Sequence, residues 1–486
     1  MIFNSLEFLI FFIVVFSLYY SFSNEKTKLQ NSLLLIASYV FYAWANWKIL
    51  ILLIVTTVCF YDLGIVVYEA KTDKRKQLFT VLAIIIGLGT LLYFKYTNFF
   101  ISSFKVLFES IGLQTNMHTF KILVPVGISF YTFRLLSYVI DIQRGKYEPT
   151  KDFTAFAAYV AFFPCIMAGP IDRPNLLIPQ LKEKRTFNSV LAVDGLRQIL
   201  WGAFKKMVVA DNIAPIVNQI FNFQDTMPAN RLLLGAVFYS FQMYGDFSGY
   251  TDMATGIAKL LGFRVTKNFN FPLFAQNIAD FWRRWHISLT SWLTDYIFMP
   301  LNIKWRNWGN GGMILAIIIN FVICGLWHGA DWTFVLWGFY HGLLFIPIIL
   351  SGAMFKKNKI ITNRWNLPTA NVFGKMLLTF FLVTMGLIIF RAESISQAYS
   401  YISRLFSTSL FSLNIGEYDV GRIEVVLSSF VILVLLCIEW WGRNGEYALS
   451  GLGIKQKWIR YSLYYFILFF VLVYKGTEHP FIYFQF

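Results

Sequence analysis

Long apolar segments recur along the whole chain, and the polar stretches between them are mostly short. A helix that crosses a membrane needs roughly 20 mostly apolar residues. Because a helix satisfies its own backbone hydrogen bonds inside lipid, the pattern predicts an all-α, polytopic transmembrane protein with about eleven spanning helices. The segments lie near residues 6–22, 31–45, 48–68, 78–94, 121–140, 231–246, 312–327, 332–350, 374–390, 425–441 and 459–475.

Two further apolar stretches are interrupted by Pro, Gly or Lys. They are 155–170, which reads "AFAAYVAFFPCIMAGP", and 196–215. Such pieces are tolerated at membrane depth only where protein or a water-filled cavity surrounds them, so we expect re-entrant helices there. No repeat or separate soluble domain is evident. Residues 1–486 are therefore expected to form one integral-membrane domain, with a motif-rich core over about 121–350 and an aromatic tail over 476–486.

Composition supports a membrane protein. The chain is 57% hydrophobic and only 14% charged, whereas a soluble domain carries roughly 25% charged residues. The net charge of +16 is typical of cytoplasmic loops that face anionic lipid. No basic run is interleaved with stacking aromatic residues in a soluble-looking segment, so nucleic acid is not an expected partner and the lipid bilayer is.

Lysine and arginine gather in loops that the positive-inside rule assigns to the cytoplasm. This orientation predicts that the N-terminus and the C-terminal tail both lie on the outer face. The main basic clusters occupy 71–76, 144–151, 356–364 and 443–460.

One histidine stands out at the end of an apolar segment. His328 lies in "CGLWHGADWTFVLWGFYHG", and ionisable residues at membrane depth are functional candidates by default. Gly325 and Gly329 allow close approach of a substrate or of a backbone, and Asp331 is placed to cap the next helix or to orient the imidazole. The alternative is a structural histidine bonded to a neighbouring helix. For His341, in "FYHG", helix packing is the favoured interpretation.

A basic and aromatic cluster occupies "DFWRRWHISLTSWL", which contains Arg283, Arg284 and His286. It fits an interfacial helix that binds lipid headgroups. It fits equally the mouth of a site for an anionic, phosphate-bearing donor, since arginine suits phosphate. Other catalytic templates fail: "GDFSG" at 245–249 is not a nucleophile elbow, and the histidines lack zinc-like spacing, so no metal is expected.

Taken together, these motifs resemble the membrane-bound O-acyltransferase superfamily, most closely its bacterial alginate O-acetyltransferase branch. The resemblance implies that His328 is the catalytic histidine and His286 the second motif histidine. It also implies a ring of tilted helices around a funnel, with the catalytic histidine in a tunnel that joins the two faces. The motifs that carry it are "LVPVGISFYTFRLLSYVIDIQRG" at 123–145, "FFPCIMAGPIDR" at 162–173, "DFWRRWHISLTSWLTDYIFMPL" at 280–301, "GLWHGADWTFVLWGFYHG" at 325–342 and the tail "FIYFQF".

The resemblance further implies an enzyme of the bacterial inner membrane with both termini periplasmic. Acetyl-CoA is the expected cytoplasmic donor substrate, with no bound cofactor, and Arg283 and Arg284 are expected at its entrance. The expected partner is a periplasmic SGNH-type acetyltransferase that O-acetylates peptidoglycan or an exopolysaccharide such as alginate. Two alternatives stay open: a D-alanyl-type acyltransferase of the same superfamily, supplied by a carrier protein, and a glycan transporter or flippase.

The tail "EHPFIYFQF", residues 478–486, has two interpretations. Aromatic residues commonly anchor a chain at the membrane interface. Alternatively the tail folds back into the outer mouth of the funnel and Tyr483 carries the acyl group briefly; it resembles the aromatic end of the small companion peptide in the related D-alanylation system. A phenol, with a pKa of about 10, is close enough to a thiol, at about 8.5, for its ester to keep much of a thioester's transfer potential.

Overall fold

The computed structural model describes residues 1–21, 27–44, 46–356, 359–411, 421–477, 479 and 481–482. Every regular element in these ranges is a helix, so the predicted all-α class is confirmed. Six of the described helices are long and apolar enough to cross a membrane: Lys48–Glu69, Asp73–Ser110, Asn310–His328, Trp332–Leu350, Ala370–Arg391 and Arg422–Gly442.

These six helices correspond to six of the eleven predicted segments. The other five segments fall in helices that are shorter or less apolar: α1 (Leu6–Ser21), α2 (Thr27–Ala43), α6 (Ile128–Gln143), α11 (Ala229–Leu260) and α22 (Lys457–Val473). The number of crossings therefore stays a prediction.

The chain forms two compact units. The first comprises Met1–Ile199 and Met253–Thr266, and the second comprises Leu200–Asp252 and Lys267–Phe486. Both units draw residues from α11. The two candidate histidines and both candidate arginines belong to the second unit.

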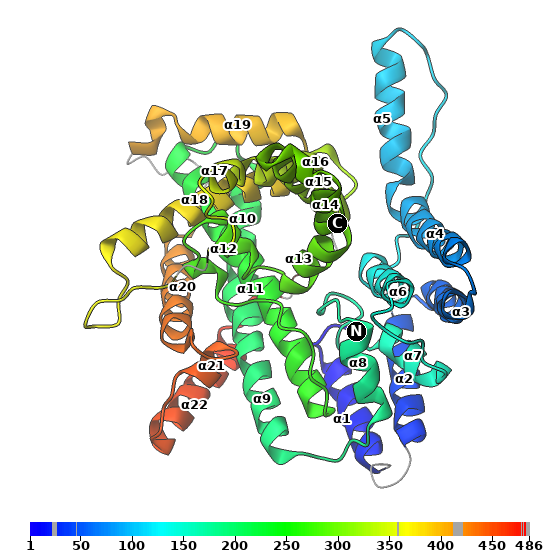
Figure 1. Cartoon of the computed structure of the whole chain (residues 1–486). Helices are drawn as coiled ribbons and strands as arrows, with labels where there is room; N and C mark the ends of the chain where they lie inside the picture. Colours follow the sequence, from blue (N-terminus) through cyan, green and yellow to red (C-terminus); the bar gives the residue numbers. More distant parts are fainter. Residues whose placement is uncertain are drawn as a thin grey trace. The chain divides into compact units, whose positions relative to one another are not determined.

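In the first unit, α6 packs against α3 and α4, and α2 packs against α7. Helix α4 continues into α5 through a π-helical turn, so Asp73–Ser110 is one long helix (Figure 1). The remaining elements of this unit are α3 (Lys48–Glu69), α4 (Asp73–Leu91), η1 (Leu92–Tyr96), α5 (Thr97–Ser110), α7 (Phe153–Ala161), α8 (Pro174–Lys182) and most of α9 (Ser189–Ala203).

The interrupted stretch 155–170 forms the short helix α7 followed by buried turns. Ending a helix at this depth exposes carbonyl groups that need hydrogen-bond donors. Arg134 of α6 supplies them: its side chain is fully buried, and it donates to the carbonyls of Pro170 at 2.7 Å and Val160 at 3.4 Å. The buried guanidinium thus stabilises the broken helix.

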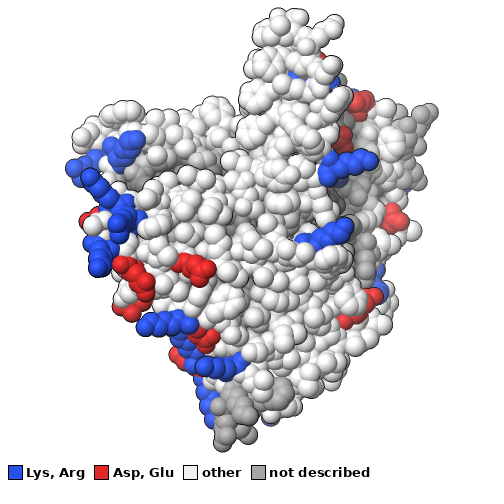
Figure 2. Space-filling view, turned by 90° about the vertical axis from the view of Figure 1, so that its right-hand side faces the viewer, with Lys and Arg blue, Asp and Glu red and all other residues white. Residues whose placement is uncertain are grey.

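The outward faces of α3 and α4 are apolar. Ile51, Val55, Leu78, Val81 and Ile85 are each at least half exposed. Figure 2 shows a broad uncharged area on one face of the molecule, with Lys, Arg, Asp and Glu gathered toward its edges. Such a surface suits hydrocarbon, since charged side chains are costly there.

The second unit contains the remaining helices. Helix α16 packs closely against α15 and also contacts α18. The elements are η2 (Phe204–Ala210), α10 (Asp211–Asn222), η3 (Pro272–Phe274), α12 (Ile278–Trp282), α13 (Ile287–Leu293), η4 (Thr294–Phe298), α14 (Met299–Lys304), η5 (Arg306–Trp308), α15 (Asn310–His328), α16 (Trp332–Leu344), α17 (Ile346–Leu350), α18 (Ala370–Arg391), α19 (Ile395–Leu405), η6 (Thr408–Phe411), α20 (Arg422–Gly442), α21 (Ala448–Gly451) and α22.

Glycines set the close approach of α15 and α16. A Cβ on Gly325 would lie 2.0 Å from the Phe334 carbonyl oxygen, and one on Gly338 would lie 2.2 Å from that of Phe321. A Cβ on Gly329 would meet the Phe334 ring at the same 2.0 Å. The glycines around His328 were expected to allow close approach of either a substrate or a backbone. The structure shows that protein groups approach them.

Candidate functional site

His328 is the last residue of α15 and is almost completely buried, with 4% of its surface exposed. Asp331 caps α16 by accepting a hydrogen bond from the Thr333 amide at 2.9 Å. This cap fixes the tight connection between α15 and α16. Aromatic rings surround the imidazole, with the rings of Trp337 and Phe390 centred 5.2 and 5.3 Å away.

His286 faces the same region from the start of α13. It is fully buried and has a left-handed backbone conformation with φ of 43°, which is uncommon for a residue other than glycine and often marks functional sites. Asn268 holds this turn: its carbonyl accepts from the Ile287 amide at 2.9 Å, and its Oδ1 accepts from the Ser288 hydroxyl at 2.9 Å. Burial lowers the pKa of His286 to about 3, so its imidazole is neutral at physiological pH.

The two histidines lie together. Their ring centroids are 6.3 Å apart, and Trp327 contacts both rings, with centroids 5.5 Å from His286 and 5.0 Å from His328. Residues that are 42 positions apart in sequence thus form one buried imidazole pair (328 − 286 = 42). This arrangement suits chemistry in which a neutral nitrogen accepts a proton in a site shielded from water.

Two cavities share Phe390 in their linings, and one of them adjoins His328. An internal one of about 20 Å³ is lined by His328, His341 and Phe390, which is room for about one water molecule. A larger pocket of about 270 Å³ is lined partly by Asp331 and Glu393, and Phe390 lines it as well. Phe390 therefore lines both spaces, and its ring also contacts His328.

His341 takes part in helix packing, as its sequence context favours. It is buried, and its Nδ1 accepts a hydrogen bond from Trp282 Nε1 at 3.3 Å. Its ring also contacts Trp337, with centroids 4.9 Å apart. Since Trp337 is in contact with His328 as well, His341 helps to hold the aromatic wall of the site.

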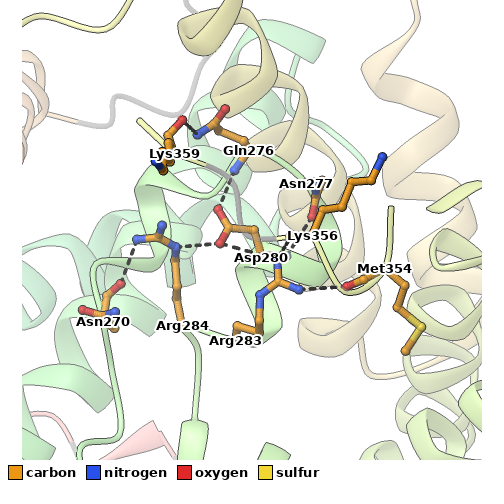
Figure 3. A network of polar contacts seen from close by, with 9 residues as sticks. All are labelled: Asn270, Gln276, Asn277, Asp280, Arg283, Arg284, Met354, Lys356 and Lys359. Atoms are coloured by element: carbon orange, nitrogen blue, oxygen red, sulfur yellow. Dashed lines mark hydrogen bonds and ion pairs between the residues drawn. The ribbon is translucent and has the colours of Figure 1, made fainter. Parts of the chain in front are cut away.

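Arg283 and Arg284 lie next to each other but serve different loops (Figure 3). Arg283, whose side chain is 37% exposed, donates to the carbonyls of Met354 at 3.0 Å and Lys356 at 3.2 Å. Arg284, 17% exposed, donates from Nε to Asp280 Oδ1 at 3.0 Å and from Nη1 to the Asn270 carbonyl at 3.4 Å. Both arginines therefore position nearby backbone, and their predicted part in donor binding stays a prediction.

The C-terminal tail returns to α11. The Ile482 amide donates to Asp246 Oδ2 at 2.8 Å, and Lys206 Nζ donates to the His479 carbonyl at 3.1 Å. Lys206 also pairs with Asp246 and with Asp211, each at 2.7 Å. All three charged side chains are buried, so a desolvated cluster holds the described part of the tail in place.

Aromatic contacts lead from the tail to His286. The Phe481 ring stacks on Tyr250 at 4.7 Å and contacts Phe247 at 5.9 Å. The Phe247 ring in turn lies 4.6 Å from the His286 ring. The tail thus folds back toward the histidine pair up to Ile482. Tyr483 itself lies outside the described residues.

Sequence reasoning missed Lys206, Asp211 and Asp246. A signal was present, because ionisable residues inside apolar segments are functional candidates. Lys206 and Asp211 interrupt the stretch 196–215, and Asp246 ends the predicted span 231–246. Their common role, which is to hold the tail, arises only when the chain folds and brings the tail next to them.

Comparison with known proteins identifies relatives over most of the chain. The model of the membrane-bound O-acyltransferase family matches residues 150–390. The chain is 36% identical to the probable alginate O-acetylase AlgI of Pseudomonas aeruginosa, over 92% of this chain and 82% of that protein. It is 31% identical to the peptidoglycan O-acetyltransferase of Helicobacter pylori, over 78% and 74% of the two chains. It is 29% identical to the teichoic acid D-alanyltransferase of Bacillus subtilis, over 55% and 69%.

Proposed function

Because this chain belongs to the membrane-bound O-acyltransferase family, we propose that it takes acetyl from cytoplasmic acetyl-CoA and passes it across the inner membrane. The recipient is a periplasmic SGNH-type acetyltransferase that O-acetylates a cell-envelope polysaccharide. The chain is a multi-pass membrane O-acyltransferase. The acetyl group and the polysaccharide are proposed from relatives named for acetylation of alginate and peptidoglycan.

The buried pair of His286 and His328 carries this proposal. Their ring centroids are 6.3 Å apart in a setting of aromatic side chains. A general base is most effective when its pKa lies near the working pH, and an imidazole starts from about 6.5. His328 would accept the proton of an attacking hydroxyl while the hydroxyl oxygen bonds to the thioester carbonyl and the CoA thiolate leaves. His286 would hold the geometry from the opposite side.

A polar pocket and a basic cluster support a path for the acyl group. The pocket that contains Asp331 and Glu393 adjoins the His328 wall through Phe390 and offers acceptors for a hydroxyl-bearing recipient. Arg283 and Arg284 would line the donor entrance, where guanidinium groups suit the phosphates of CoA. The positive-inside rule assigns their neighbourhood to the cytoplasm, where CoA resides.

The tail supports a relay through Tyr483. Ile482, its neighbour in sequence, is fixed by Asp246, and Phe481 is linked through Phe247 to His286. In the relay, the Tyr483 phenol attacks the thioester, His328 accepts the phenolic proton, and the resulting aryl ester delivers acetyl to the partner.

The proposal is tested with purified protein in sealed proteoliposomes. Acetyl-CoA and the periplasmic partner are added on the two faces, and release of free CoA thiol is followed. Release that depends on the partner and disappears in His328→Ala is expected, with His118→Ala, a change at an exposed histidine, as the matched control. Turnover only from a thioester on a carrier protein would favour the D-alanyl-type enzyme. Glycan movement without thioester turnover would favour a transporter.

A further inference from the structure

An apolar groove that does not include the histidine pair in its lining lies between α18 and α20, the yellow and orange helices of Figure 1. It has a volume of about 360 Å³, within the range of about 300–1,000 Å³ found for ligand sites. Its floor includes the buried Met376 of α18, and its mouth includes Leu377 and Leu433, which are 51% and 59% exposed. The groove is therefore open to the surroundings of α18 and α20.

Their expected surroundings are hydrocarbon. Both helices are long and apolar enough to cross a membrane, and unfilled space along close-packed side chains forfeits dispersion contacts. A groove of this kind in a bilayer is filled by lipid chains rather than by water, because its lining is almost entirely apolar and water needs polar partners.

One end of the groove carries positive charge. Arg443 follows α20 directly, and its guanidinium lies 4.1 Å above the Trp440 ring, which lines the groove. Asn366 fixes this corner: its carbonyl accepts from Trp440 Nε1 at 2.8 Å, and its Oδ1 accepts from Arg443 Nη2 at 2.6 Å. Arg364 adds a second positive charge two residues before Asn366, and its guanidinium lies over the Trp365 ring. Arg443 Nη1 also donates to the Trp440 carbonyl. Since arginine has five N–H donors, further donors of Arg443 remain for a phosphate.

We propose that this groove binds one acyl chain of an anionic phospholipid, with the headgroup phosphate at Arg443. Tryptophan and arginine together at the end of an apolar groove match the boundary between lipid chains and headgroups. The basic clusters 356–364 and 443–460 assign this end to the cytoplasmic leaflet, which is rich in anionic lipid. The bound lipid is a resident component of the fold and not an acyl donor.

The groove is connected to the catalytic region through shared walls. Leu273 and Phe380 line both the groove and a small internal cavity of about 10 Å³. Trp285 and Val383 line that cavity and also the one that contains His328. A lipid chain in the groove therefore supports the outer side of the wall whose inner side faces His328.

Photolabelling of the full-length protein in nanodiscs tests the site. The probe is phosphatidylglycerol with a diazirine in one acyl chain, in a phosphatidylcholine background, and labelled peptides are mapped by mass spectrometry. We expect labels on the peptides of α18 and α20 that line the groove. Met376→Trp, which fills the groove, should abolish them, and Arg443→Gln should reduce them about fivefold, as expected for one basic residue beside an anionic headgroup.

Matched controls separate this site from general lipid contact. Leu378→Trp changes an exposed position of α18 that does not line the groove, and Arg460→Gln removes a charge from the start of α22; both should label as the unmodified chain does. Equal labelling by a phosphatidylcholine probe, or labels spread evenly over the lipid-facing helices, would overturn the proposal.

Cys437 provides a test that does not depend on the folding of a variant. It is exposed and lines the groove, so a long-chain alkyl methanethiosulfonate tethers a hydrocarbon chain there through a mixed disulfide, with methanesulfinate as the leaving group. Groove labelling should then disappear, and Cys437→Ser should be insensitive to the reagent. Unchanged labelling after complete conversion of Cys437 to the mixed disulfide would contradict a single acyl-chain site.

Discussion

Among single side chains, His328 has the surroundings expected of a reacting group, because it is buried beside a second imidazole and lines a small cavity. His328→Ala should lower acetyl transfer by about 10²- to 10⁴-fold, the contribution typical of a general base. Membrane insertion and thermal stability should change little by comparison. Turnover near that of the unmodified enzyme in a well-folded variant would exclude this role.

Arg283 and Arg284 test donor binding against loop positioning. Changing both to Gln should raise the KM for acetyl-CoA more than it lowers kcat, because uniform binding is lost. Asp280→Asn is the matched control, since it weakens the bond to Arg284 without removing a positive charge. If Asp280→Asn raises KM equally, or if only expression and lipid affinity fall, the arginines do not bind the donor.

Tyr483→Phe removes one hydroxyl and keeps the ring. If Tyr483 carries the acetyl group, expression stays normal and acetyl delivery to the periplasmic partner stops, because no phenol is left to form the aryl ester. Acetylation of the polysaccharide in cells measures the effect. The double variant Phe481→Tyr/Tyr483→Phe tests whether a phenol two residues earlier can replace that of Tyr483. Wild-type acetylation in Tyr483→Phe would leave the tail as a membrane anchor.

At the scale of elements, buried charged side chains of α11 and η2 hold the described part of the C-terminal tail in place. Asp246→Ala leaves Lys206 with one carboxylate fewer and frees the Ile482 amide. Breaking a buried pair costs about 3–5 kcal/mol, so the tail should detach and become open to carboxypeptidase Y. Asp252→Ala is the control. Asp252 lies in α11, as Asp246 does, but it pairs with Lys205 at 2.6 Å. Equal protection of the tail in both variants would show that Asp246 does not hold it.

For the whole molecule, the distribution of basic residues predicts which loops face the cytoplasm. In a chain freed of its native cysteines, a cysteine at Lys74 should escape an impermeant maleimide in intact cells. A cysteine at Gln114, in the next loop, should react. Both positions are exposed, so accessibility of the thiol is not limiting. The reverse pattern would invert the topology and with it the assignment of the donor side.

The sequence by itself determined the all-α class, the family and the two motif histidines, because hydrophobic length and local motifs are properties of contiguous residues. It also indicated the cap at Asp331 and the packing role of His341, which depend on near neighbours. Only the tertiary structure decided that His286 and His328 form one pair, that Lys206 and Asp246 hold the tail, and where the apolar groove between α18 and α20 lies. Each of these joins positions distant in sequence, and such contacts arise only when helices pack.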